Sequence, residues 1–400
     1  MTFFIFLKKI TIKIMFFKKN KKEEKNVNHS SSQVFYQNIG KPTWTDRDFV
    51  HLANESYVKN VIANRCIEIV AKGASTVKLQ IIDKKTDEIL HKHKILDLLK
   101  KPNPFLTQTE FFETLYSQKL ISGNCFVQAI FAKDEKFKNP QELYILRPDR
   151  INIIAGNNSI PLAYKYKVDS NETIFPVNVL NGQCEVLHIK NYNPVNDWYG
   201  MSQVEPAAYS IDQHNEASKW NKSILQNGAK PCGALVVKND GENNYLTDEQ
   251  FRHLKEQLND EFSGSTNAGK PLLLEGGLDW KEISLTPKEM DFLEMKHSTA
   301  RDIALSFGVP SQLIGIPGDN TYNNMSEARL FLWEQTIIPM IESVLNSLNN
   351  WLIPMFDGEY EISYDRNSIT PLSVRKENFW KLINESNFLT IEEKKKLLKI

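Results

Sequence analysis

A loop rich in glycine, proline and asparagine separates two long helical patterns, and it reads GVPSQLIGIPGDNTYNNMSEA over residues 308–328. The helix before it is predicted to start at Thr286, where threonine, proline and glutamate fit a capping box, and to run to Phe307 before Gly308 ends it. The helix after it is strongly apolar, and Pro339 in its interior removes a backbone hydrogen bond and predicts a kink. The loop alone fits a catalytic lid, a phosphate cradle or a hinge.

A second long helix is predicted over residues 205–227, and its apolar stripe is thin. Ala208, Ile211 and Trp220 belong to that stripe, among amide and charged residues. A thin stripe indicates packing against other helices at an interface. Between this helix and the one before the loop, residues 231–285 follow a strand, helix, strand, strand pattern. We therefore expect a stalk of two helices side by side, with a small module at its far end.

The first half of the chain predicts a mixed unit of helices and short strands, so the fold class is α+β. One helix is predicted over residues 45–72 and ended by Gly73, and another starts at a capping box formed by Thr107 and Glu110. Short strands follow Gly123, and the later segment YEISYDRNS predicts a strand that returns to this unit. The apolar sides of the two helices are predicted to consist of Val58, Val61, Ile62, Cys66, Ile69 and Val70 in the first, and Phe111, Phe112, Leu115 and Leu120 in the second.

Charge and cysteine content exclude several classes of protein. The 400 residues contain 49 Lys plus Arg and 49 Asp plus Glu, so no global field draws the chain to nucleic acid or to an anionic membrane, and any such contact is local. The four cysteines form no C-x-x-C pair, which argues against zinc and redox motifs, and we expect no metal and no cofactor. Residues 1–28 carry eight lysines against two glutamates and predict a disordered basic arm, with a membrane-surface anchor as the alternative.

The chain contains no complete motif of a hydrolase, a metalloprotease or a nucleotide-binding fold. The nearest approach to a phosphate loop is GSTNAGKP, in which Gly264, Gly269 and Lys270 fit the spacing. Pro271 stands where serine or threonine would hold magnesium, and the segment leads from a helix into a strand, the reverse of the required order. We therefore predict that the protein is not an enzyme.

Five segments in order resemble the portal proteins of tailed bacteriophages, the connectors between head and tail. They are KPNPFLTQTEFFETLYSQKLISGNCFV (101–127), LRPDRI (146–151), DWYGMSQVEPAA (197–208), NAGKPLLLEGGLDWKEISLTPKEMDFLE (267–294) and IALSFGVPSQLIGIPGDNTYNNMSEA (303–328). The resemblance covers about residues 40–355. Where members of that family usually have Gly-x-Ser-Pro-Leu, this chain has Gly200, Ser202, Gln203 and Val204. The part after residue 372 is short, so a tall helical crown is not expected.

The resemblance implies a ring of twelve copies at one capsid vertex, around the channel through which double-stranded DNA is packaged and ejected. The implied partners are further copies of the chain, double-stranded DNA, the large terminase, the head-tail adaptor, and the major capsid and scaffold proteins, with no membrane. The implied location is the virion, after assembly in the cytoplasm of the host bacterium. The implied parts are a disordered basic arm (1–30), an α+β wing (31–203), stem helix 1 (204–230), a clip (231–285), stem helix 2 (286–308), a tunnel loop (309–325), a kinked helix with the return strand of the wing (326–372), and short crown-like C-terminal helices (373–400).

The resemblance places the loop at the narrowest point of the channel. A lysine-rich bore would hold duplex DNA by counterion release, whereas residues 309–325 contain no lysine or arginine and a single acid, so they favour sliding. The alternatives are an ordinary polar loop on a monomeric protein, a monomeric phage-derived adaptor or scaffold component, and a soluble α+β enzyme. The residues implied at the channel are Ile316, Pro317, Gly318, Asp319, Asn320, Thr321, Tyr322, Asn323 and Asn324 in the loop, and Lys288, Asp291, Glu294, Lys296 and Arg301 in the stem.

Overall fold

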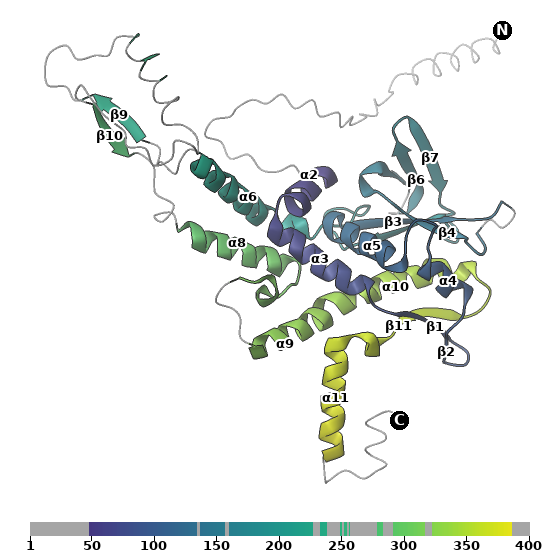
Figure 1. Cartoon of the computed structure of the whole chain (residues 1–400). Helices are drawn as coiled ribbons and strands as arrows, with labels where there is room; N and C mark the ends of the chain where they lie inside the picture. The colour runs from purple at the N-terminus through teal and green to yellow at the C-terminus, as the bar shows by residue number, and fades with distance from the viewer. Residues whose placement is uncertain are drawn as a thin grey trace, which may run out of the picture. The chain divides into compact units, whose positions relative to one another are not determined.

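Figure 1 shows the computed structural model, which describes residues 48–133, 137–156, 160–226, 233–237, 249, 252–253, 256, 278–282, 291–316 and 322–385. All of these residues belong to one unit, Trp44–Ile400. The α-helices are α2 (Phe49–Ala53), α3 (Val61–Ser75), α4 (Lys94–Lys100), α5 (Gln108–Ser122), α6 (Val204–Gln226), α8 (Phe292–Ser306), α9 (Tyr322–Phe331), α10 (Ile338–Leu352) and α11 (Thr370–Glu385). Two π-helical segments, η1 (Asn54–Val58) and η5 (Leu332–Ile337), lie between α2 and α3 and between α9 and α10.

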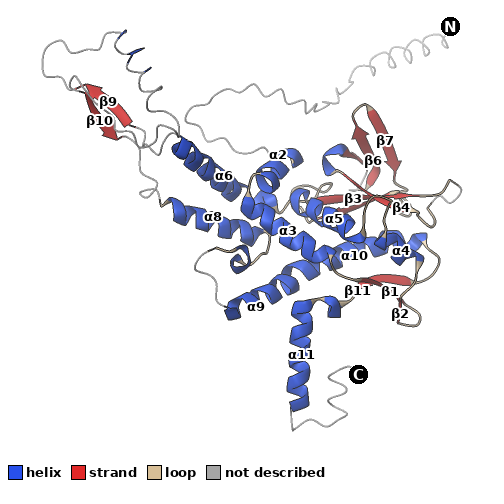
Figure 2. Cartoon of the chain, in the orientation of Figure 1, coloured by secondary structure: helices blue, strands red, loops and turns tan. Residues whose placement is uncertain are grey.

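Within the described ranges the strands form four small antiparallel sheets, so the fold is a mixture of helices and sheets, as the sequence predicts. Figure 2 shows the strands of residues 79–190 and 360–364 gathered near α5 and α10, while α6, α8 and α9 extend away from them. The sheets are β11-β1-β2 (Tyr360–Tyr364, Leu79–Asp83, Glu88–Leu90), β4-β3-β8 (Glu142–Leu146, Asn124–Ile130, Val186–Lys190), β5-β6-β7 (Ile151–Ala155, Pro161–Val168, Asn171–Pro176) and β10-β9 (Leu278–Glu282, Gly233–Val237).

The strand β11 pairs with β1 although some 280 positions of sequence separate them, as Ile81 opposite Ile362 shows. This is the returning strand that YEISYDRNS predicts. It is joined to α10 because Asn349 of that helix exchanges two hydrogen bonds with the backbone of Ile362, at 2.7 and 2.9 Å. The C-terminal helices are therefore fixed to the first half of the chain by backbone pairing as well as by apolar packing.

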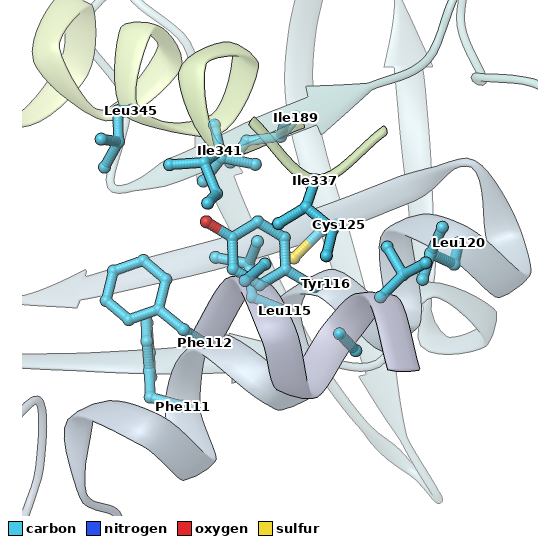
Figure 3. Close-up of a cluster of buried hydrophobic side chains, with 14 of the residues drawn as sticks. Phe111, Phe112, Leu115, Tyr116, Leu120, Cys125, Ile189, Ile337, Ile341 and Leu345 are labelled. Atoms are coloured by element: carbon cyan, nitrogen blue, oxygen red, sulfur yellow. The ribbon is translucent and has the colours of Figure 1, made fainter. Parts of the chain in front are cut away.

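The helix α5 lies at the centre of the main hydrophobic core (Figure 3). It begins at the predicted capping box, in which the Thr107 side chain accepts from the Glu110 backbone and the Glu110 carboxylate accepts from the Thr107 backbone. The side chains on its buried face meet those of β3, β8, η5 and α10. The residues labelled in Figure 3 are Phe111, Phe112, Leu115, Tyr116, Leu120, Cys125, Ile189, Ile337, Ile341 and Leu345.

The prediction that Gly73 ends the first helix is wrong, because Gly73 lies inside α3. A β-carbon at this position would lie 2.9 Å from Cδ1 of Ile337. Glycine is therefore present because the π-helical segment η5 crosses α3 here at close range, and not because the helix terminates.

The predicted apolar side of the first helix is also partly wrong. Cys66 and Val70 are fully buried, but Val58 and Val61 are 71% and 68% exposed. The cause is a break in the helix at Asn60, which caps α3 and rotates the preceding turn. Hydrophobic periodicity that continues across residue 60 does not reveal such a break.

The proline predicted to kink the long helix occupies the first turn of α10. The segment before it is π-helical, and the backbone amide of Ile338 donates to the carbonyl of Trp333, five residues back. Because Pro339 has no amide and its ring needs space beside the preceding turn, a widened π turn accommodates it. The size of a kink at Pro339 stays a prediction.

Two backbones meet at the start of α6. Gly123 caps α5 with φ of 72°, and a β-carbon there would lie 2.3 Å from the carbonyl oxygen of Met201. Gly200 is equally close, because its β-carbon would lie 2.2 Å from the Gly123 oxygen. The Asn124 side chain accepts from the Gly200 amide at 2.7 Å and donates to the Gly200 carbonyl at 3.1 Å. This glycine contact sets where α6 begins relative to α5 and β3.

We expect Gly123→Ala to lower the free energy of unfolding by more than about 3 kcal/mol, since left-handed strain of about 1–2 kcal/mol is added to a backbone clash. The matched control is Gly182→Ala, where φ is 70° and no atom lies within 4 Å of the added carbon. Only the strain applies there. Chemical denaturation followed by circular dichroism measures both variants, and equal losses would contradict the close contact.

His188 contributes a pH dependence to the same region. Its ring stacks on Phe126 with centroids 4.3 Å apart, and Nε2 lies 3.0 Å from Oδ1 of Asn124. Burial, assisted by the positive charge of Lys190, lowers the pKa of His188 from 6.5 to about 3. The folded state therefore favours the neutral ring, and stability present above pH 6.5 is lost as the pH falls toward 3.

Between pH 7 and pH 5 we expect His188 to account for a loss of about 2 kcal/mol in the free energy of unfolding, at about 1.4 kcal/mol per pH unit below 6.5. His188→Gln keeps an amide donor for Asn124 and should flatten the dependence by that amount. His51→Gln, on the more exposed α2, is the control. Denaturation curves at the two pH values that keep the same difference in His188→Gln as in the unaltered protein would refute the assignment.

Candidate functional site: a helix pair and the loop after it

The helices α6 and α8 pack side by side and run antiparallel (Figure 1). Trp220 near the end of α6 stacks on Phe292 at the start of α8, with ring centroids 5.1 Å apart. At the other end the Ser306 hydroxyl donates to the carbonyl of Gln203, just before α6, at 2.6 Å. Small side chains let the two helices approach closely. The buried alanines of the pair are Ala207, Ala208, Ala217, Ala300 and Ala304.

The charged residues implied for the stem lie mostly on the outer side of α8. Glu294 and Arg301, seven positions apart, are both exposed, and Lys296 is half-buried toward α6. Asp291 is exposed directly before the helix, with a left-handed backbone (φ 44°). Lys288 and the predicted capping box at 286–289 lie outside the described residues. The opposite side of α8 is apolar and buried, through Phe292, Ala300, Ile303 and Ala304.

A buried polar cluster joins α6 to the break before α3. The Asn60 side chain accepts from the first amides of α3 and donates to Oδ1 of Asn215 at 3.0 Å. Its amide nitrogen also lies 3.3 Å from Nδ1 of His214, and Asn215 donates to the Glu55 carbonyl at 3.0 Å. Burial, with the nearby positive charge of Lys296, lowers the pKa of His214. The sequence pattern did not predict this cluster, although an asparagine directly before a helical pattern is a recognised N-cap signal.

The first part of the predicted tunnel loop is folded onto the core of its own subunit. Gly308, with φ of 64°, ends the described helix as the sequence predicts, and the Val309 amide donates back to the Ala304 carbonyl at 2.9 Å. The Thr336 hydroxyl of η5 donates to the Gly308 carbonyl at 2.7 Å. A 3₁₀ turn, Ser311–Ile314, follows, and Val309 is buried in the main core.

The predicted channel contact can involve only part of the predicted tunnel loop, because the two ends of that loop belong to other parts of the fold. Ile316 is only 4% exposed, so this side chain anchors the base of the loop. Residues 317–321, which include Pro317, Gly318, Asp319, Asn320 and Thr321, lie outside the described residues. Tyr322, Asn323 and Asn324 form the first turn of α9, where Asn324 is exposed.

A groove of about 1240 Å³ opens beside this loop base. Its walls come from the last turns of α8, residues 308–312, α9 with the start of η5, and the first residues of α11. Leu305 of α8 and Phe331 of α9 line it and are 78% and 56% exposed. Large exposed apolar side chains on facing walls are typical of a surface that another protein covers.

The described residues contain little from which to build a reactive site. Within them, no group of three or more His, Cys, Asp or Glu residues could hold a metal ion. No helix in that part of the chain is long and apolar enough to cross a membrane. Cys66, Cys125 and Cys184 are buried free thiols, and burial raises the pKa of Cys66 and of Cys125 to about 12, which leaves them unreactive.

Comparison with known proteins gives a consistent result. The family model described as phage portal protein matches residues 62–398. An uncharacterized protein of Rickettsia bellii is 43% identical over 346 residues, 86% of this chain and 88% of that protein. The portal protein of Enterobacteria phage HK97 is 23% identical over 343 residues, 82% of this chain and 76% of that protein. A chain from the neck of a native gene transfer agent particle, computed with C12 symmetry, is 35% identical with a TM-score of 0.67, covering 90% of this chain and 96% of that one.

The fold and the helix pair define the class: a mixed α+β protein with an extension of two paired helices. The family match, which spans most of the chain, makes the assignment specific: this protein belongs to the phage portal protein family. That family consists of structural proteins and not of enzymes, so the predictions of family and of no enzymatic role are confirmed. The soluble enzyme considered above is thereby excluded.

Proposed function

We propose that the chain is the portal of a phage-derived particle: a ring of twelve copies at one capsid vertex, with a central channel through which double-stranded DNA is packaged and ejected. The observation that carries the proposal is the similarity, over 90% of this chain, to a neck chain of a gene transfer agent particle computed with C12 symmetry. The antiparallel pair α6 and α8 fits a stem, since it buries one side within the subunit and leaves the other for neighbours and the bore.

The charge of the helix pair supports a bore through which DNA slides. The described part of α8 with Asp291 carries three carboxylates and two basic groups, and α6 also carries three carboxylates and two lysines. Duplex DNA has one charge per about 1.7 Å of axis, so a surface of net basic charge would retain it by counterion release. A slightly acidic surface does not retain duplex DNA in this way. Residues 231–285 would face the large terminase during packaging and the head-tail adaptor afterwards, with the capsid and scaffold proteins around the wing.

The assembly is tested by electron microscopy and mass photometry of the purified protein. We expect ring-shaped particles of several hundred kilodaltons with twelvefold symmetry, because the twelve copies close through heterologous contacts. A stable species of 46.1 kDa at all concentrations would contradict the proposal and favour the monomeric adaptor.

The sliding bore is tested by adding charge to the loop. In rings of Asn320→Lys, each copy contributes one extra positive charge at the constriction, so binding of a short linear duplex should tighten and its logarithm should fall more steeply with the logarithm of salt concentration. Asn181→Lys, in the exposed turn after β7, is the control at a site outside the loop. If the two variants bind the duplex equally at every salt concentration, residues 317–321 do not contact DNA.

A further inference from the structure

The corner between η1 and α3 exposes two apolar side chains that the packing of the single subunit does not use. Val58 and Val61 are β-branched residues at helical spacing, and the hydrophobic pattern assigns them to a core. The structure turns both outward because the helix breaks at Asn60. We call Val58 and Val61 the valine corner. Single exposed apolar residues are common on proteins, so the geometry around the corner decides its meaning.

The valine corner is held rigidly. The side chain of Asn60, which lies between the two valines, is almost fully buried and is hydrogen-bonded to α6 and to the first turn of α3. The Lys59 amide donates to the Asn54 carbonyl at 3.0 Å, which closes the π turn. A corner fixed in this way loses little conformational entropy when a partner covers it. This is the property of a preformed contact and not of a fluctuating loop.

A second exposed apolar feature, the groove lined by Leu305 and Phe331, lies on another part of the surface and could receive the valine corner of a second copy. Its lining residues run from 301 to 334 with 370 and 371, so none of them belongs to the valine corner. The corner follows α2 and begins α3, which Figure 1 draws in purple, whereas α8 and α9, which supply walls of the groove, are drawn in green. Val309 and Ala328 line the groove and are buried, which gives it an apolar floor between the two exposed side chains.

We infer that the valine corner of one copy seats in the Leu305–Phe331 groove of the next copy around the ring. A cyclic ring requires two different, complementary surfaces on every subunit, and these two surfaces meet that requirement. This inference rests on the proposed ring. The charges of the two surfaces are of opposite sign. The corner has a net positive charge from Lys59 and Arg65 against Glu55, whereas the groove has a net negative charge from three carboxylates against two arginines.

The test is cross-linking of cysteine pairs in the full chain with Cys232 changed to Ser. The four pairs combine Val58→Cys or Val61→Cys with Leu305→Cys or Phe331→Cys, and a short bismaleimide should link neighbouring copies of at least one pair into a ladder that ends in a closed covalent ring. The native cysteines of the described residues are buried. The matched control is Leu180→Cys with Leu305→Cys, because Leu180 is 98% exposed in the turn after β7, and it should give no ladder.

A second readout uses charge. Val61→Glu and Leu305→Glu should each raise the concentration for half-assembly by at least about tenfold, while Leu180→Glu should leave it unchanged and circular dichroism should show all three folded. If the unaltered protein forms no ring, the proposed function fails first. If it forms rings, none of the four pairs links copies and both glutamate variants assemble normally, then the ring stands and the assigned contact is wrong.

Discussion

The position of the paired helices depends on a contact between two backbones, at Gly123 and Gly200. A β-carbon at either glycine would collide with a carbonyl group of the opposite segment, so the contact holds only while both residues lack one. The side-chain amide of Asn124 accepts a hydrogen bond from the Gly200 amide and donates one to the Gly200 carbonyl. This matters because α6 has little apolar surface of its own. Its placement comes from the glycine contact at one end, the Asn60 cluster along its length, and Trp220 on Phe292 at the other end.

Signals that act over a few residues predicted the structure well. The capping box at Thr107 and the stop at Gly308 are local, and the structure has both. The returning strand was also predictable because its period-two pattern is independent of its partner. The failure at Val58 and Val61 is local, because the helix breaks at the N-cap Asn60 between them. The other failures concern contacts between segments far apart in sequence: Gly73 resembles a helix end until Ile337 is seen against it. The Asn60 cluster and the groove were missed for the same reason, since their members come from several elements.

The π-helical segment η5 connects three features that lie apart in the sequence, at Gly73, Gly308 and Pro339. It ends directly before the turn that contains Pro339, its Ile337 packs on Gly73 of α3, and its Thr336 holds the carbonyl of Gly308. A proline placed only to bend a helix would not need the other two contacts. The widened turn instead presents two successive side chains to two different neighbours. The end of α8 and the base of the loop are thus tied to the same point in the core.

In the proposed ring, apolar surfaces and charged surfaces have different roles. The apolar contacts, the valine corner and the Leu305–Phe331 groove, would join subunits where water is excluded, whereas the helix pair presents nearly balanced charge. Val309 and Ile316, at the two ends of the loop base, are buried, and residues 310–314 between them are half-buried. DNA that pushes on residues 317–321 would load η5 through Gly308 and Thr336, and it would also load the groove, because Gly308 and Val309 line it. The loop and the proposed contact between copies are therefore mechanically coupled in each chain, because the same residues, 308–312, form the base of the loop and a wall of the groove.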